Sequence, residues 1–282
     1  MKLIDCPRDA MQGLHDFVPT ETKAGYLNRL LKVGFDTLDF GSFVSPQAIP
    51  QMADTEAVLA QLEPSPTRLL AIVANVRGAE KACSLPAIGF LGFPLSVSEE
   101  FQQRNTRKSI ARALGEVAVM QERCSASGKK LVVYLSMAFG NPYGEDYSPQ
   151  TVVDLTGKLV DLGVSIIAPS DTIGSSTPEG IRTLFGTLLP AFPGVEFGAH
   201  LHSTPEKVRE KMEATWEAGV RRVDGALRGF GGCPMAADQL TGNMPTEAWV
   251  AFLEEKGADL ALNTDALNNA MAYSGNVFGM GR

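Results

Sequence analysis

The chain has 282 residues, of which 44% are hydrophobic and 20% charged, which is ordinary for a soluble globular protein. Its formal net charge is −7 and it has no basic run, which argues against nucleic acid and anionic membranes as partners. The four cysteines are widely spaced, and no apolar stretch approaches the roughly 20 residues of a membrane span. Charged residues come too early for a secretory signal, so we expect a cytoplasmic protein with reduced thiols.

Short apolar runs alternate along the chain with longer stretches of helical periodicity. The runs are almost continuously hydrophobic, which suits parallel strands that are buried on both faces. We predict eight strands, at residues 2–6, 35–40, 68–74, 87–92, 130–138, 164–168, 195–201 and 220–227.

The helices between these strands carry recognisable start signals. Ser148, Thr177 and Thr204 each offer a hydroxyl N-cap followed by a proline, and these prolines are 29 and 27 residues apart. Eight such strand-loop-helix units predict a single-domain (β/α)8 TIM barrel over residues 1–282, with a C-terminal helical extension. An open doubly wound sheet is the alternative, but it would usually have a glycine-rich phosphate turn after the first strand, where this chain has CPRDAMQG.

Residues 198–204 read GAHLHST and contain two of the three histidines in the chain. His200 and His202 are two residues apart, so on a strand both side chains point to the same side. Two imidazoles at the C-terminal end of a barrel strand suit a divalent metal, and Asp9 from the first strand would complete the ligand set. The alternative is a pair of histidines hydrogen-bonded within a packed layer. His15 lies alone in a polar loop and is given no role.

Arg8 and Asp9 directly follow the first predicted strand, so they are expected at the mouth of the barrel. Asp9 would bind the metal, and Arg8 would hold an anionic oxygen in its fork of N–H donors. A surface ion pair is the alternative for these two residues. Asp39 ends the second strand, and either direct metal binding or support of a ligand would suit it.

The segment GFGGCPMA places three glycines beside Cys233, which predicts a mobile flap over the site. A glycine-rich connector with an inert thiol is the alternative. Asn243 follows ten residues later, either as a turn residue or as a ligand through its carbonyl oxygen.

Several motifs in this order resemble the 3-hydroxy-3-methylglutaryl-CoA lyase family. They are PRDAMQ at 7–12, SFVSPQAIPQMAD at 42–54, DTIGSSTP at 171–178, HLH at 200–202 and GFGGCPMAADQLTGNMPTE at 229–247. The resemblance implies a metal-dependent barrel that cleaves an acyl-CoA thioester by a retro-Claisen reaction into acetyl-CoA and a keto acid such as acetoacetate. It also implies Mg²⁺ or Mn²⁺ as cofactor, a homodimer and a role in leucine degradation.

Site roles also follow from the resemblance, position by position. Asp9, His200, His202 and Asn243 match the family's metal ligands, and Arg8 matches the arginine that stabilises the enolate oxygen. His200 also matches the histidine to which the family assigns proton transfer, and either His200 or Asp9 would take the hydroxyl proton. Cys233 matches the cysteine of the flap over the active site.

This chain departs from the family pattern at two positions. Asp39 replaces a glutamate, which is one methylene longer, so we expect its contact to become water-mediated. Ala10 replaces a glycine, which narrows the backbone freedom beside Asp9. These departures leave the exact acyl group open.

Other functions remain as alternatives. Two belong to the same superfamily: a Claisen condensation with a 2-oxoacid and a 4-hydroxy-2-oxoacid aldolase. A metal-dependent hydrolase and a non-catalytic metal-binding barrel are more distant.

Overall fold

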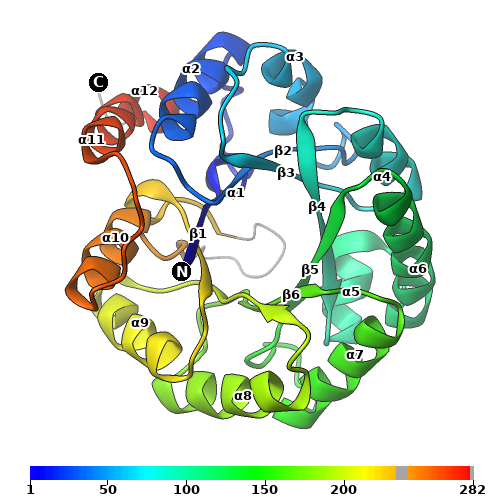
Figure 1. The fold of residues 1–282 in the computed structure, drawn as a ribbon. Helices are drawn as coiled ribbons and strands as arrows, with labels where there is room; N and C mark the ends of the chain where they lie inside the picture. Colours follow the sequence, from blue (N-terminus) through cyan, green and yellow to red (C-terminus); the bar gives the residue numbers. More distant parts are fainter. Residues whose placement is uncertain (233–240, 280–282) are drawn as a thin grey trace.

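The computed structural model describes residues 1–232 and 241–279. The strands are β1 Lys2–Asp5, β2 Thr37–Ser42, β3 Arg68–Ile72, β4 Ile88–Ser96, β5 Lys130–Ser136, β6 Ile166–Asp171, β7 Glu196–Phe197, β8 His200–Leu201 and β9 Arg222–Gly225. The α-helices are α1 Pro7–Gln12, α2 Thr20–Leu31, α3 Thr55–Leu59, α4 Val76–Cys83, α5 Glu99–Thr106, α6 Ile110–Ala126, α7 Pro149–Asp161, α8 Pro178–Ala191, α9 Val208–Glu217, α10 Thr246–Glu255, α11 Thr264–Tyr273 and α12 Gly275–Phe278. Short 3₁₀ helices are η1 Pro50–Met52, η2 Pro205–Lys207 and η3 Leu227–Gly229. Figure 1 shows the strands at the centre and the helices in a ring around them.

The strands form one parallel sheet that closes on itself. They run in the order β7-β6-β5-β4-β3-β2-β1-β9, and β8 pairs with β6 beyond the end of β7. A parallel bridge between Ala199 and Val223 joins the two ends, where the Ala199 N–H donates to the Arg222 carbonyl at 3.0 Å. The predicted (β/α)8 barrel is therefore confirmed, and the open doubly wound sheet is wrong because the sheet edges pair with each other.

The eight predicted strands all occur, but several of their ends differ. The run at 195–201 forms two short strands, β7 and β8, which are separated at residues 198–199. β4 and β6 continue to Ser96 and Asp171, past the predicted ends at 92 and 168. These extensions are partly polar, so a search for apolar runs ends too early at the mouth of the barrel.

Only one of the three predicted N-caps forms as expected. The Thr177 hydroxyl accepts from the Gly180 N–H at 3.1 Å at the start of α8. Ser148 precedes α7 but its hydroxyl lies 3.3 Å from the Thr151 hydroxyl and caps no backbone N–H, so that prediction is wrong. The third is wrong as well, because Thr204 precedes the 3₁₀ helix η2 and makes no cap with its side chain.

The last helices extend the barrel and pack against its first long helix. α11 and α12 lie beside α2 in Figure 1. The rings of Tyr26 and Phe278 meet edge to face at 6.0 Å, and the Arg29 guanidinium lies 3.9 Å from the centre of the Tyr273 ring. These contacts confirm the C-terminal helical extension.

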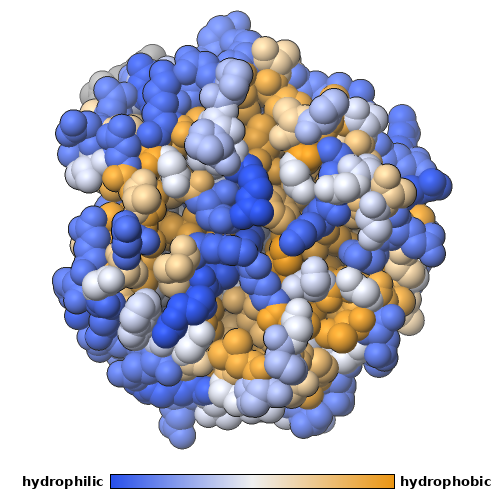
Figure 2. Space-filling view, viewed as in Figure 1, coloured by the Kyte–Doolittle hydropathy of each residue, from blue (hydrophilic) through white to orange (hydrophobic). Residues whose placement is uncertain are grey.

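Ion pairs lie across the end of the barrel where the strands begin. Glu196 at the start of β7 accepts from Lys2 at 2.5 Å and from the buried Arg222 at 3.1 Å. Figure 2 shows this face, with hydrophilic side chains gathered around its centre. Above the ion pairs, the barrel interior is filled by an apolar cluster that includes Leu70 and Phe90. Among the described residues, no helix combines the length and apolar character that crossing a bilayer requires.

A buried carboxyl group in β1 makes stability depend on pH. Burial raises the pKa of Asp5 to about 7, although the Thr246 hydroxyl donates to its Oδ1 at 2.5 Å. Within the described ranges its Oδ2 has no hydrogen-bond partner. Because the folded pKa exceeds the unfolded one, the stability cost of Asp5 is absent below about pH 4, grows between about pH 4 and pH 7, and stays constant at higher pH.

We therefore expect Asp5→Asn to raise the thermal unfolding midpoint, and by several degrees more at about pH 8 than at about pH 5.5. Calorimetry of the variant and the wild type at both pH values measures this difference. Asp161→Asn, at the exposed end of α7, is the matched control and should change neither midpoint. An Asp5→Asn effect that is independent of pH would contradict the buried, protonated state of Asp5.

Candidate active site

The residues after β1 form a short helix at the C-terminal end of the barrel. α1 begins at Pro7, and proline suits the first helical position because it has no N–H to leave unpaired. Arg8 and Asp9 follow in the first turn, and both are buried. Ala10 is helical as well, so this position needs none of the backbone freedom that a glycine would supply.

Three of the predicted site residues meet at this mouth. One ligand atom each from Asp9, His200 and His202 lie within 4.8 Å of one another, and the two imidazole centres are 5.3 Å apart. Both ring nitrogens of His202 are buried and, among the described residues, have no hydrogen-bond partner. Burial and the neighbouring His200 lower the pKa of His202 to about 4, so it is neutral at physiological pH. A neutral, unpartnered imidazole beside a carboxylate fits a divalent cation.

His200 is oriented by a carboxylate from the next strand along the chain. Its Nδ1 lies 3.1 Å from Oδ2 of Asp224 in β9. Burial favours a lower pKa for His200, but the hydrogen bond and charge of Asp224 outweigh it and raise the pKa. Asp224 thus fixes the proton on Nδ1 and leaves Nε2 as the free nitrogen. The sequence analysis missed Asp224, although an acidic residue inside an apolar strand was a usable signal.

We expect Asp224→Asn to weaken Mn²⁺ binding about 10–100-fold, which is the usual loss when a residue that hydrogen-bonds a metal ligand is replaced. An asparagine can present its amide N–H to Nδ1, which places the imidazole proton on Nε2 and blocks that nitrogen. Titration calorimetry with Mn²⁺ measures the change, and Asp154→Asn on the exposed face of α7 is the control. Unchanged affinity in Asp224→Asn would contradict this positioning role.

Arg8 is held by two buried carboxylates. Its Nε and Nη2 donate to Asp39, the latter at 2.6 Å, and its Nη1 donates to Asp9 at 3.2 Å and to Gln12 at 2.8 Å. Asp39 therefore contacts Arg8 directly, because its side chain is long enough to reach the guanidinium, and a water-mediated contact of Asp39 with the metal site stays a prediction. These bonds use one N–H on Nε, two on Nη1 and one on Nη2, so one Nη2 N–H remains free.

The carboxyl groups around Arg8 differ in charge state. Burial raises the pKa of Asp39 to about 6 in spite of the Arg8 guanidinium. Burial acts the same way on Asp9, but Arg8 and His200 outweigh it, so the pKa of Asp9 is lowered. Asp9 is thus an ionised ligand candidate, whereas Asp39 pairs with Arg8 and stands outside the group of ligand atoms.

Asn243 lies against Asp9, but its amide nitrogen makes the contact. Nδ2 donates to Asp9 Oδ2 at 2.7 Å and to the Phe230 carbonyl at 2.9 Å. An antiparallel bridge between His202 and Asn243 brings the two residues together. The structure thus confirms that Asn243 belongs to this cluster, and its role as a carbonyl-oxygen ligand stays a prediction.

The glycine-rich segment before Cys233 passes close to Asp9. Gly231 has a φ of +103°, and a Cβ there would lie 2.7 Å from Asn243 Nδ2 and 3.0 Å from the Asp9 carbonyl oxygen. Only glycine fits this approach. Cys233 itself lies outside the described residues, so its position over the site stays a prediction.

A buried ion pair supports His202 from behind. Lys211 Nζ of α9 donates to Asp171 Oδ2 at 2.7 Å and to the His202 carbonyl at 2.7 Å. The Ser176 hydroxyl donates to the same carboxylate oxygen at 2.5 Å. These bonds fix the backbone that carries His202. Lys211 was also missed, since a lysine in an amphipathic helix is ordinarily exposed.

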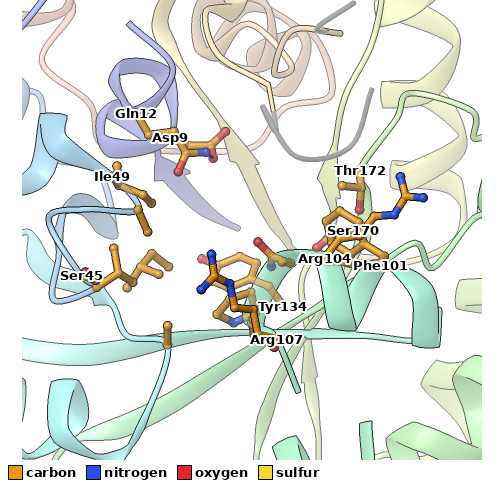
Figure 3. Close-up of a pocket in the computed structure, with 18 of the residues that line it drawn as sticks. Asp9, Gln12, Ser45, Ile49, Phe101, Arg104, Arg107, Tyr134, Ser170 and Thr172 are labelled. Atoms are coloured by element: carbon orange, nitrogen blue, oxygen red, sulfur yellow. Dashed lines mark hydrogen bonds between the residues drawn. The ribbon is translucent and has the colours of Figure 1, made fainter. Parts of the chain in front are cut away.

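Arg8, Asp9, His200 and His202 line a cavity of about 600 Å³ at the mouth of the barrel. Figure 3 shows Asp9 and Gln12 on one side of it and Tyr134 and Arg107 across from them. The hydroxyl of Tyr134 is buried and has no hydrogen-bond partner in the part of the chain that is described, and its ring lies 5.4 Å from that of His200. Tyr134 is a further site residue that its apolar strand context concealed.

Comparison with known proteins agrees with this architecture. The chain matches the HMGL-like family over residues 1–273. It is 30% identical to hydroxymethylglutaryl-CoA lyase YngG of Bacillus subtilis, covering 95% of this chain and 89% of that protein. It is 29% identical to (R)-citramalyl-CoA lyase of Chloroflexus aurantiacus, covering 93% of this chain and 85% of that one.

A solved structure shares the whole fold. An HMG-CoA lyase from Acinetobacter baumannii, in complex with coenzyme A and 3-methylmalate, superposes with a TM-score of 0.91 at 28% identity, covering 99% of this chain and 91% of that one. The protein described here therefore belongs to the HMGL-like family and is an enzyme of the carbon–carbon lyase class.

Proposed function

We propose that the protein cleaves a 3-hydroxy-3-methylglutaryl-CoA-like thioester into acetyl-CoA and a keto acid such as acetoacetate. The carrying observation is the buried group of Asp9, His200 and His202 beside Arg8 in one cavity. These three residues, with Asn243 next to them, would hold a divalent cation, Mg²⁺ or Mn²⁺. When bound, the cation supplies Lewis acidity that lowers the pKa of the substrate C3 hydroxyl.

His200 is the residue that we assign to proton transfer. Its Nδ1 faces Asp224, so Nε2 must serve both as ligand and as base, and the two roles exclude each other at any instant. We therefore propose that Asp9 and His202 would stay as ligands throughout the reaction while Nε2 of His200 accepts the hydroxyl proton. The Asp224 carboxylate then stabilises the imidazolium.

Arg8 stabilises the charge that develops as the carbon–carbon bond breaks. The bonding electron pair moves onto the thioester fragment as an enolate, and the C3 hydroxyl carbon becomes the ketone. The free Nη2 N–H of Arg8 donates to the enolate oxygen, and its neighbours hold it in place before the reaction. Protonation of the enolate carbon gives acetyl-CoA, with His200, a bound water or Cys233 as the proton source.

A thioester screen tests this function. Purified protein with Mg²⁺ or Mn²⁺ is incubated with 3-hydroxy-3-methylglutaryl-CoA or citramalyl-CoA, and acetyl-CoA release is measured with an EDTA control. Citramalyl-CoA is included because one relative is named for its cleavage. Condensation of acetyl-CoA with 2-oxoacids, in the absence of any cleavage, would overturn the proposal in favour of a synthase. A homodimer, a cytoplasmic location and a role in leucine degradation stay predictions, and the relatives' names include both cytoplasmic and mitochondrial forms.

A further inference from the structure

The C-terminal end of α5 places positive charge along one wall of the cavity. Arg104, Arg107 and Lys108 line it together with Arg8, and Asp9 is the only acidic residue among the described residues that do so. An anionic ligand is therefore favoured in this cavity over a neutral or cationic one.

Three of these four cations already have partners. Asp39 holds Arg8, as described above. Arg104 Nε donates to Glu100 at 2.7 Å, and Lys108 Nζ donates to Glu116 at 2.5 Å. Arg107 is exposed, and its backbone N–H donates to the Gln103 carbonyl at 2.8 Å. Within residues 1–232 and 241–279, its guanidinium forms no hydrogen bond or ion pair. Arg107 is thus the cation of this wall that is left available to a ligand.

The backbone conformation at Arg107 also favours glycine over arginine. It is the C-cap of α5 with φ 57° and ψ 35°, a left-handed conformation in which glycine is usual. Among the described residues the arginine side chain gives the fold no hydrogen bond or ion pair in return, so its presence is better explained by binding than by stability.

We infer that Arg107 binds an oxyanion of the acyl-CoA substrate, an inference that rests on the function proposed above. Its planar fork of N–H groups matches a phosphate or a carboxylate. Asp9 and His202 are buried whereas Arg107 is an exposed residue of the same cavity, so a substrate that reacts at Asp9 and His202 would extend its CoA half toward Arg107. The expected partner is a CoA phosphate, and the carboxylate of the acyl group is the second source of the same chemistry.

Two variants distinguish ligand binding by Arg107 from a general effect of surface charge. We expect Arg107→Gln to raise KM for the acyl-CoA about fivefold with kcat unchanged, since an exposed ion pair contributes at most about that factor. Arg112→Gln in α6 is the matched control, because Arg112 is equally exposed but lies outside the cavity. Arg107→Gly should raise KM equally without lowering the thermal unfolding midpoint. Salt should reduce the difference between wild type and Arg107→Gln.

Two further ligands distinguish the phosphate from the carboxylate. Calorimetry gives Kd for free CoA, which needs no turnover, and kinetics give KM for the same acyl group on pantetheine, which carries no phosphate. A weaker CoA Kd in Arg107→Gln with an unchanged pantetheine KM assigns the phosphate. An unchanged CoA Kd with both thioester KM values raised assigns the carboxylate.

Negative results are equally distinct. Wild-type values for all ligands in Arg107→Gln, in an enzyme that cleaves the thioester, overturn this inference and leave the proposed function standing. A wild type that neither binds CoA nor cleaves any thioester overturns the proposed function and this inference with it.

Discussion

Replacement of Arg8 by glutamine is expected to lower kcat about 10²–10³-fold, the usual loss when a preorganised donor to a developing oxyanion is removed. The same change should destabilise the fold, because Asp39 and Asp9 would remain buried without their shared cation. Acetyl-CoA release measures the first effect and thermal unfolding measures the second.

A second substitution separates these two effects. In Arg8→Gln/Asp39→Asn one of the two uncompensated carboxylates is gone and only Asp9 remains, so the unfolding midpoint should recover in part while kcat stays low. Asp39→Asn alone leaves Arg8 bonded to Asp9 and Gln12 and should reduce kcat less. A near-wild-type kcat in Arg8→Gln would remove Arg8 from the mechanism.

Replacement of His202 by leucine is expected to abolish turnover and to weaken Mn²⁺ binding more than 100-fold, beyond the loss expected for a residue that only supports a ligand. The metal-free variant should nevertheless be at least as stable as the wild type. Neither ring nitrogen of His202 has a partner in the described part of the chain, and an unsatisfied buried polar group costs about 1–3 kcal/mol.

Thermal unfolding with EDTA and with Mn²⁺ tests this prediction. Mn²⁺ should raise the midpoint of the wild type, because a ligand of the native state stabilises it, and should leave His202→Leu unchanged. His15→Leu, at the exposed remaining histidine, should behave as wild type. A full Mn²⁺ shift in His202→Leu would place the cation elsewhere.

The barrel was predictable because its information is local. Each apolar run and each helical stretch is read from neighbouring residues, and eight repeats in one chain leave few arrangements. Strand ends were harder to predict, since Ser96 and Asp171 continue their strands with polar side chains that an apolar pattern excludes. The C-cap position of Arg107 likewise leaves no trace in hydropathy.

The site residues were also predictable only where their signal is local in the sequence. Arg8, Asp9 and the two histidines were found because they lie at or just past the C-terminal ends of predicted strands, where a barrel concentrates function. Asp224 and Lys211 act on His200 and His202 from 24 and 9 positions away, and only the folded chain brings them into contact. Cys233 was equally evident in the sequence, but its place lies outside the described residues.

The ion pairs of Lys2, Glu196 and Arg222 bear on how substrate enters the enzyme and how products leave it. They and the apolar cluster of Leu70 and Phe90 occupy the opposite end of the barrel, and none of these residues lines the cavity, so we expect ligands to enter and leave at the mouth. With the function proposed above, a thioester that reacts at Asp9 would fill this mouth with its nucleotide, and the small keto acid would form behind it. We therefore expect the thioester product to leave first and to compete with fresh substrate for the same entrance.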